Sequence, residues 1–400
     1  MLENANFEEL CNDPYPFYAE LRAKGQPTYS VFNNGTSTNL EGIWLVADYK
    51  QAVEVFKNTT TISKSSLSIK SPSEIDLFDF AILNLDGVEH DHIHKIMQKL
   101  FVSKSLKKIE YTVASLTTEL LTKLAAKPKF DFVAEFCDIL PLHVISTLIG
   151  FSTEHIHFIR QRSLIITDAL DSLSVDDNKL QAQRVAFEQV IKLIETEIEQ
   201  KRRAPSNDFI SELIKKEHAG EISANHSKAI ILFLLLAGHE TTVYLLSTCM
   251  MLLLSHPAQL KLLRGGSDNI VQTTIEEVLR YESSKQRTSF RITTQNIDVG
   301  GVSIPKGAQI GIIINAVNRD PAIFDNADEF LIERKPNPHL AFGLGTHNCI
   351  GKQLARMELK ILLSQFWIHL PNVTLEGQPD WRRNTFFRGL NTLNMVNQPS

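Results

Sequence analysis

The sequence contains few of the residues that interrupt helices. Glycine (18) and proline (15) together make up about 8% of the 400 residues, below the roughly 12% of average proteins. This scarcity favours long helices, while 43% apolar and 22% charged residues exclude a wholly disordered chain. The length gives a soft expectation of two or three domains. Because no linker rich in proline or glycine divides the chain, we predict a single domain over residues 1–400.

Cysteine is scarce as well. The chain has four cysteines, which lie far apart and form no Cys-x-x-Cys pair: Cys11, Cys137, Cys249 and Cys349. This spacing excludes a disulfide-rich secreted scaffold and favours a reducing compartment. The acidic, polar start MLENANFEEL also lacks the basic and apolar regions of a signal peptide. We therefore expect a cytoplasmic protein.

Positive charge is not in excess. Lysine and arginine total 41 against 46 aspartates and glutamates, which gives a net charge of −5. A nucleic-acid-binding domain would favour a strongly basic balance, so we expect no nucleic-acid partner. We also see no internal repeat and no low-complexity tract.

Long apolar runs are missing except between residues 229 and 254. This run is long enough to span a membrane, but Gly238, His239, Glu240, Thr241 and Thr242 interrupt it. A carboxylate at a bilayer centre costs about 2.5–3.5 kcal/mol. We therefore predict a buried helix in a large core, and no membrane span.

Hydrophobic periodicity indicates a mainly α protein with a small β portion. Apolar residues recur at spacings of three and four, as in helices, over residues 113–124, 143–148, 184–203 and 206–216. Residues 43–46 and 291–306 have strand character instead, and Asp48 is placed to open a helix after the first of these.

The polar turn inside the apolar run conflicts with its surroundings. Gly238 costs about 1 kcal/mol relative to alanine in a helix interior, and Glu240 is expensive to bury unless it is paired or hydrated. Such conflicts often mark functional sites. A hydroxyl such as Thr241 can hold an oxygen atom, and a neighbouring carboxylate with water can supply protons to it. The alternative is a polar turn with a purely structural role, in contact with another helix or a water pocket.

The most informative segment is FGLGTHNCIG, residues 342–351, which a helical pattern follows. Its glycines permit sharp turns and close backbone approach. Cys349 stands just before the predicted helix, where backbone N–H groups and the helix dipole should lower the pKa of the thiol. A thiolate there is a candidate metal ligand or nucleophile. The alternatives are a buried structural cysteine, a cysteine protease, and a zinc site with His347, although no second ligand pair follows.

Residues 342–356, FGLGTHNCIGKQLAR, resemble the haem-binding loop of the cytochrome P450 family, Phe-x-x-Gly-x-x-x-Cys-x-Gly. Residues 237–242, AGHETT, resemble the oxygen-activation motif of the same family, and Glu277 with Arg280 matches its Glu-x-x-Arg pair. The resemblance extends over nearly the whole chain. It implies the cytochrome P450 fold, mainly α with a small β-sheet region.

The resemblance also implies the residues that bind haem b. Cys349 would be the axial thiolate on the iron, a ligation that favours O–O cleavage. Further cofactor contacts are implied at His347, Arg291, His90, Phe342, Gly343, Gly351, Ala237 and Gly238. The family usually has an arginine four residues after the histidine at position 90, whereas this chain has His94. A histidine is shorter and titrates near neutral pH.

Three further groups follow from the resemblance. Glu240 and Thr241 would act in proton delivery to oxygen. Glu277 and Arg280 would form a buried ion pair, with Arg334 as a third member, beneath the cysteine loop. The substrate pocket would be apolar and would include Phe78, Phe80, Leu236, Ala237, Phe290, Phe386 and Phe387.

The function implied is a haem-thiolate monooxygenase. It would insert one oxygen atom from O2 into an apolar small molecule, free or carrier-tethered, in secondary metabolism or catabolism. Electrons would come from NAD(P)H only indirectly, through a ferredoxin or a flavodoxin-type donor, and the protein would be a monomer. The alternatives are coupling, desaturation or peroxygenation, and a non-catalytic haem sensor.

A basic patch is expected to guide the electron donor. Its members lie in one lysine-rich segment and around the cysteine loop: Lys95, Lys99, Lys104, Lys107, Lys108, Lys352 and Arg356. Such a patch would attract an acidic protein. The alternative is an ordinary solvated face.

Overall fold

The computed structural model describes residues 7–31, 42–65, 76–168, 170–171, 177–266 and 268–398. Its α-helices are α1 (Phe7–Asn12), α2 (Tyr15–Ala23), α3 (Tyr49–Lys57), α4 (Gly87–Gln98), α5 (Ser103–Ala125), α6 (Leu140–Ile149), α7 (Ile156–Asp168), α8 (Asp177–Arg203), α9 (Phe209–His218), α10 (Ala224–Ser255), α11 (Pro257–Gly265), α12 (Asp268–Tyr281), α13 (Ile314–Val317) and α14 (Lys352–His369). Single turns of other helix types are η3 (Leu77–Phe80), η4 (Ile82–Asn84), η5 (Val133–Cys137) and η6 (Thr153–His155).

The strands are short and gather in small sheets. They are β1 (Thr28–Val31), β2 (Gly42–Val46), β3 (Ile62–Ser63), β4 (Lys129–Asp131), β5 (Arg291–Thr293), β6 (Ile297–Val299), β7 (Val302–Ile304), β8 (Gln309–Ile312), β9 (Val373–Leu375), β10 (Asp380–Trp381), β11 (Leu390–Thr392) and β12 (Asn394–Asn397). The largest sheet has the order β1-β2-β8-β5-β3, in which β2 and β8 are parallel. The others are β4-β12-β9 and the pairs β6-β7 and β10-β11.

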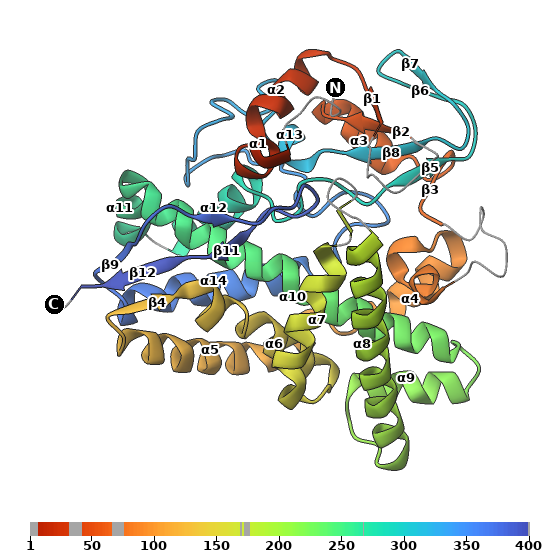
Figure 1. The fold of residues 1–400 in the computed structure, drawn as a ribbon, viewed down its shortest axis with the longest axis horizontal. Helices are drawn as coiled ribbons and strands as arrows, with labels where there is room; N and C mark the ends of the chain where they lie inside the picture. The colour runs from red at the N-terminus through yellow and green to blue at the C-terminus, as the bar shows by residue number, and fades with distance from the viewer. Residues whose placement is uncertain are drawn as a thin grey trace.

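Helix α10 runs through the middle of the molecule. In Figure 1 the five-stranded sheet with α2 and α3 lies on one side of α10, and α5 and α6 lie on the opposite side. The helix is long and apolar enough to cross a membrane, but most of its apolar stretch is buried inside the protein. The prediction of a buried core helix is therefore confirmed. Burial of this helix from all sides explains why its apolar residues follow no single stripe.

The local sequence patterns predicted most of these elements. Residues 113–124, 143–148 and 184–203 lie within α5, α6 and α8, and residues 43–46 lie within β2. The Asp48 carboxylate accepts a hydrogen bond from the Gln51 backbone N–H at 2.9 Å and so opens α3 as expected. The stretch 291–306 is divided into β5, β6 and β7 by two turns. The mainly α fold with a small β portion is confirmed.

Three segments position the candidate site. They are the middle of α10, the cysteine loop that precedes α14, and the segment that joins α12 to β5. The cysteine loop is Phe342–Gly351 in sequence, and it contains two glycines in the left-handed region, Gly343 (φ 68°) and Gly345 (φ 76°). A side chain on Gly345 would lie 2.8 Å from the backbone oxygen of Phe56 on α3, so only glycine fits there.

Candidate active site

Backbone hydrogen bonds hold the cysteine loop in a tight turn. The Cys349 N–H donates to the Phe342 carbonyl at 2.8 Å, and the Asn348 N–H donates to the Gly345 carbonyl at 3.1 Å. Gly351 is the residue before the first turn of α14, and its N–H points to the sulfur of Cys349. The loop thus presents Cys349 at the start of a helix, as the sequence predicts.

The protonation of Cys349 differs from the sequence-based prediction. Burial raises the pKa of the thiol above its usual value, and the Gly351 N–H and Lys285 lower it by less. The prediction of a lowered pKa from the helix start alone was wrong, because it left out desolvation. Cys349 is nevertheless solvent-accessible, whereas Cys11, Cys137 and Cys249 are buried. Cys349 is thus reachable by solvent although the surrounding protein desolvates its thiol.

One face of α10 is accessible in the same way. Ala237 is exposed, and Gly238 and Thr241 are partly exposed, although this part of α10 is otherwise mostly buried. Residues 237 and 241 are one turn apart and share a face of the helix. The Thr241 hydroxyl donates to the Ala237 carbonyl at 2.9 Å. A side chain at Gly238 would press on Ile145 of α6 at 3.0 Å, so this glycine also lets two helices approach.

Glu240 points away from that face and is fully engaged. It is 1% exposed and accepts hydrogen bonds from Arg160 Nη1 and Ser163 Oγ, both at 2.8 Å, and from the Tyr244 hydroxyl at 2.7 Å. Burial by itself would raise the pKa of Glu240, but His239, Arg160 and Arg382 outweigh it and lower the pKa to about 2. The sequence-based condition that Glu240 be paired is therefore met, and the side chain is an anion at neutral pH.

Histidines gather beside the cysteine loop. His347 Nε2 lies 3.1 Å from Asp86 Oδ1, and the His347 ring lies 4.4 Å from that of His90, which stacks at 5.6 Å on His94. Burial lowers the pKa values of both His347 and His94. His94 is therefore neutral near pH 7 and does not replace the positive charge of an arginine.

Two buried cations lie near these histidines. Arg291 on β5 is 7% exposed, and its Nη1 has no hydrogen-bond partner among the residues that the structure describes. Lys64, which follows β3, is also 7% exposed, and its Nζ donates to Ser289 Oγ and to the Phe290 carbonyl at 3.2 Å. Sequence reasoning missed Lys64, because a single lysine in a serine-rich stretch has the pattern of a surface loop.

The Glu277–Arg280 pair on α12 is completely buried. Arg280 Nε and Nη2 donate to the two Glu277 carboxylate oxygens at 2.8 and 2.9 Å, and Arg334 Nε adds a contact at 3.1 Å. Arg280 also donates to the carbonyls of Asn318 and Ala327. The pair therefore fixes the irregular backbone between α13 and the cysteine loop.

The predicted pocket residues fall into two groups. Phe386 and Phe387 pack edge to face at 4.7 Å, and Phe387 lies 5.9 Å from Tyr244 of α10, close to the polar turn. Phe290 is linked to them through Arg287, whose guanidinium covers the rings of both Phe290 and Phe386. Leu236 precedes Ala237 on α10 and is buried.

Phe78 and Phe80 lie elsewhere. Phe78 packs on Phe187 of α8 at 4.8 Å, and Phe80 packs on His226 at 5.1 Å. His226 is three turns before Ala237, about 16 Å along the helix axis. Phe80 is therefore separated from the accessible face of α10, while Phe78 packs against α8.

The expected basic patch is only partly free. Arg356 makes a two-pronged pair with Glu276, 2.7 Å at each contact, and Lys99 pairs with Glu212 at 2.7 Å. Lys352 donates to Asn348 of the cysteine loop at 3.1 Å. Four exposed lysines pair with no acid among the described residues and lie on α4 and α5: Lys95, Lys104, Lys107 and Lys108.

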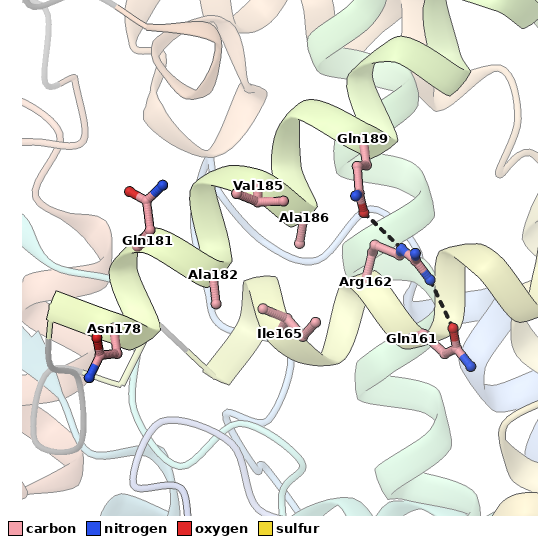
Figure 2. Close-up of a pocket in the computed structure, with 9 residues that line it drawn as sticks. All are labelled: Gln161, Arg162, Ile165, Asn178, Gln181, Ala182, Val185, Ala186 and Gln189. Carbon is pink, nitrogen blue, oxygen red and sulfur yellow. Dashed lines mark hydrogen bonds between the residues drawn. The ribbon is translucent and has the colours of Figure 1, made fainter.

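A separate hollow of about 670 Å³ lies between α7 and α8. Figure 2 shows that its one charged side chain, Arg162, donates to Gln161 and Gln189, and that the other lining residues are amides or apolar side chains. It contains none of the predicted site residues. Within the described ranges, no group of three His, Cys, Asp or Glu side chains is placed to hold a metal ion, which counts against the zinc interpretation.

Comparisons with known proteins agree with the geometry. The family model "Cytochrome P450" matches residues 153–369. A Bacillus subtilis (strain 168) protein named cytochrome P450 is 32% identical over 396 residues, which cover 96% of this chain and 93% of the relative.

Solved structures give the same result over nearly the whole chain. P450BioI in complex with an acyl carrier protein ligated to hexadec-9Z-enoic acid is 28% identical with a TM-score of 0.88, and the match covers 98% of this chain and 100% of the other. A myxobacterial cytochrome P450 in complex with myristic acid is 26% identical with a TM-score of 0.90, and the match covers 98% of each chain.

Proposed function

The chain belongs to the cytochrome P450 family of monooxygenases, and we propose that it binds haem b through Cys349 and inserts one oxygen atom from O2 into an apolar small molecule. The observation that supports this most is the accessible Cys349 thiol in a glycine turn, in a chain whose central helix is itself accessible at Ala237 and Thr241. We propose further that residues 1–400 form one domain around this site.

The residues present fit a haem. The group has a flat apolar ring, an iron that a thiolate can ligate, and two anionic propionates. The buried Nη1 of Arg291, which lacks a partner among the described residues, fits a propionate oxygen. His347 and Lys64 lie close enough to interact electrostatically, and both belong on the same side as Arg291. When bound, a thiolate-ligated haem supplies the electron density that favours O–O cleavage.

The polar turn would manage water and protons. The Thr241 hydroxyl is on the accessible face, where its Oγ1 can hold a proton. Glu240 is an anion behind this face, because the pKa of its carboxyl is about 2. Its part is therefore to attract protons and orient the turn through Arg160 and Tyr244. It would not itself release a proton at neutral pH.

Electrons would come from separate proteins, and ultimately from NAD(P)H. The exposed lysines of α4 and α5 are the surface that fits an acidic ferredoxin or flavodoxin-type donor. The family resemblance and the polar composition support a soluble, cytoplasmic protein. Two structural neighbours hold a fatty acid or a fatty acyl chain, so a long apolar chain is a reasonable first class of substrate.

The function is tested by reconstitution. Purified protein with haem, NADH and a surrogate ferredoxin system should oxidise members of a panel of fatty acids and terpenoids, with one labelled atom from isotopic O2 in the product. Products without labelled oxygen would indicate coupling or desaturation instead. No NADH-driven oxidation over the whole panel would favour a haem sensor.

A further inference from the structure

Four cationic side chains lie close together beside the cysteine loop. They are Lys64, which follows β3, Lys285 and Arg287 from the segment after α12, and Arg291 on β5. Burial lowers the pKa of each, and for Lys285 the neighbouring Arg287 and Arg291 lower it further, to about 8. Four like charges in one desolvated region are costly unless anions accompany them.

Three of these cations have an assignment. Lys64 donates to Ser289 and to the Phe290 carbonyl. Arg287 stacks on two phenylalanine rings and has further contacts within the protein. Arg291 faces the proposed propionate. They therefore leave Lys285 as the cation to be explained.

Lys285 makes no hydrogen bond or ion pair through its Nζ with any residue that the structure describes. Its one contact of note is with Phe386, whose ring centroid lies 4.6 Å from Nζ. Its backbone is bridged to Phe387, which in turn reaches Tyr244 of α10. The ammonium group thus lies against one aromatic ring of the predicted substrate pocket, and its backbone is joined to a second pocket residue.

Lys285 also lies near the thiol. It is close enough for its positive charge to lower the pKa of the Cys349 thiol, although burial raises that pKa by more. Lys285 is partly accessible although the surrounding protein desolvates it, the same combination that Cys349 shows. Both side chains are therefore accessible to solvent in a part of the protein that desolvates them.

We propose that Lys285 anchors the carboxylate of an otherwise apolar substrate, with the carboxyl end held close to the reaction centre. This inference rests on the proposed function and names its substrate class. A carboxylate matches Lys285, the one ammonium of this four-cation cluster that lacks a partner among the described residues, while the phenylalanines suit an alkyl chain. A carrier-tethered acyl thioester has no free carboxylate, so the site favours the free acid.

Ligand binding tests the proposal without relying on turnover. The haem-loaded protein is titrated with straight-chain carboxylates from octanoate to hexadecanoate and with the methyl ester of each, by calorimetry and by the shift of the haem absorption band. We expect the best carboxylate to bind roughly 10- to 100-fold more tightly than its ester, the range of a charge-assisted hydrogen bond.

Substitutions then assign the preference to one side chain. Lys285→Met and Lys285→Gln should bind the acid and the ester equally, and Lys285→Arg should keep most of the preference. The matched control is Lys306→Met, which removes an exposed lysine from the turn between β7 and β8. This variant should bind the acid and the ester with the wild-type affinities.

Several results would overturn the proposal. These are equal binding of acid and ester to the wild type, no binding of any carboxylate, or a preference that survives in Lys285→Met and Lys285→Gln. Loss of haem in both variants would assign Lys285 to a haem propionate. If the wild-type protein has a spectrum typical of nitrogen ligation and both variants lose that spectrum, Lys285 would be an iron ligand. A wild-type protein without haem contradicts the proposed function itself, which separates the two failures.

Discussion

At the scale of single residues, the polar turn of α10 separates two tasks between neighbours. Glu240 is buried and has three donors, whereas Thr241 is partly exposed and bonds only within its own helix. The motif predicts the importance of both residues, but the sequence could not show that Arg160 on α7 would be the partner of Glu240. An arginine in an amphipathic helix has no local signal for such a contact.

Glu240→Gln should destabilise the protein. The substitution removes one of the two carboxylates that pair with Arg160, because Asp138 also contacts its guanidinium. The free energy of unfolding should therefore fall by about 2 kcal/mol, less than when a buried charge is left unpaired. Urea unfolding of the purified variant measures this. Glu333→Gln, on an exposed side chain, is the control. A loss in Glu240→Gln no larger than in the control would contradict the structural part assigned to Glu240.

Thr241→Val should behave differently. Its hydroxyl bonds to the carbonyl of its own helix, so removal should cost less than about 1 kcal/mol of stability. Product formed per O2 consumed should fall several-fold, because protons are then no longer held at that position. Parallel oxygen-electrode and product measurements test this, and an unchanged ratio would remove Thr241 from the mechanism.

Glu358 on α14 gives a prediction about pH. It is fully buried, both carboxylate oxygens lack a hydrogen-bond partner among the described residues, and burial raises its pKa to about 8. The folded protein keeps this proton up to about pH 8, whereas the unfolded chain loses it above about 4.5, so stability should fall as the pH rises through that window. Glu358→Gln should abolish this slope.

The size of the effect can be bounded. Glu358→Gln should match the wild type near pH 5 and exceed its free energy of unfolding by about 2 kcal/mol near pH 8, after an allowance for relaxation around the charge. Unfolding in urea at several pH values measures both limits. If the free energy of unfolding changes with pH equally in the variant and the wild type, the pKa of Glu358 is not raised in the folded protein.

At the scale of elements, α12 and the cysteine loop are tied together by ion pairs that the sequence shows only in part. The Glu277–Arg280 spacing predicts a shared helix face. The bonds from Arg280 to distant carbonyls require the tertiary fold. In the same way the sequence predicts that Arg356 is a free surface charge, but the side chain pairs with Glu276 of α12. Helices and strands follow from local periodicity, whereas such long-range partners have no local signature.

Glu277→Ala should prevent haem retention. It leaves Arg280 and Arg334 as buried cations without their shared carboxylate, at a cost of about 3–5 kcal/mol, and it loosens the backbone before the cysteine loop. The ratio of haem absorbance to protein should drop severalfold after gel filtration. Glu329→Gln is the control, because the backbone carbonyl of Glu329 accepts from Arg280 while its side chain is exposed. Full haem content in Glu277→Ala would refute this link.

At the scale of the whole molecule, charge is distributed unevenly. The chain has a net charge of −5, yet exposed lysines line α4 and α5, next to the histidines of the candidate site. An acidic donor would be attracted to this face against the overall charge. Sequence alone predicted the lysine cluster but overestimated its number of free positive charges. Arg356 pairs with Glu276, and Lys99 pairs with Glu212.

Charge reversal on this face should slow reduction. We expect a combined substitution of Lys104, Lys107 and Lys108 by glutamate to lower the rate of reduction by a surrogate ferredoxin about tenfold at low salt, with the difference shrinking at high ionic strength. Stopped-flow spectroscopy measures the rate. Lys192→Glu on the exposed surface of α8 should have little effect, and an equal loss there would argue against a specific docking face.

The central claim is that the Cys349 thiolate ligates haem iron, and the spectrum of the reduced protein with carbon monoxide tests it most directly. We predict the strongly red-shifted band that is typical of thiolate ligation, and its loss in folded Cys349→Ser protein. A band typical of histidine ligation in fresh, intact wild-type protein would contradict the account, as would an unchanged spectrum after the substitution.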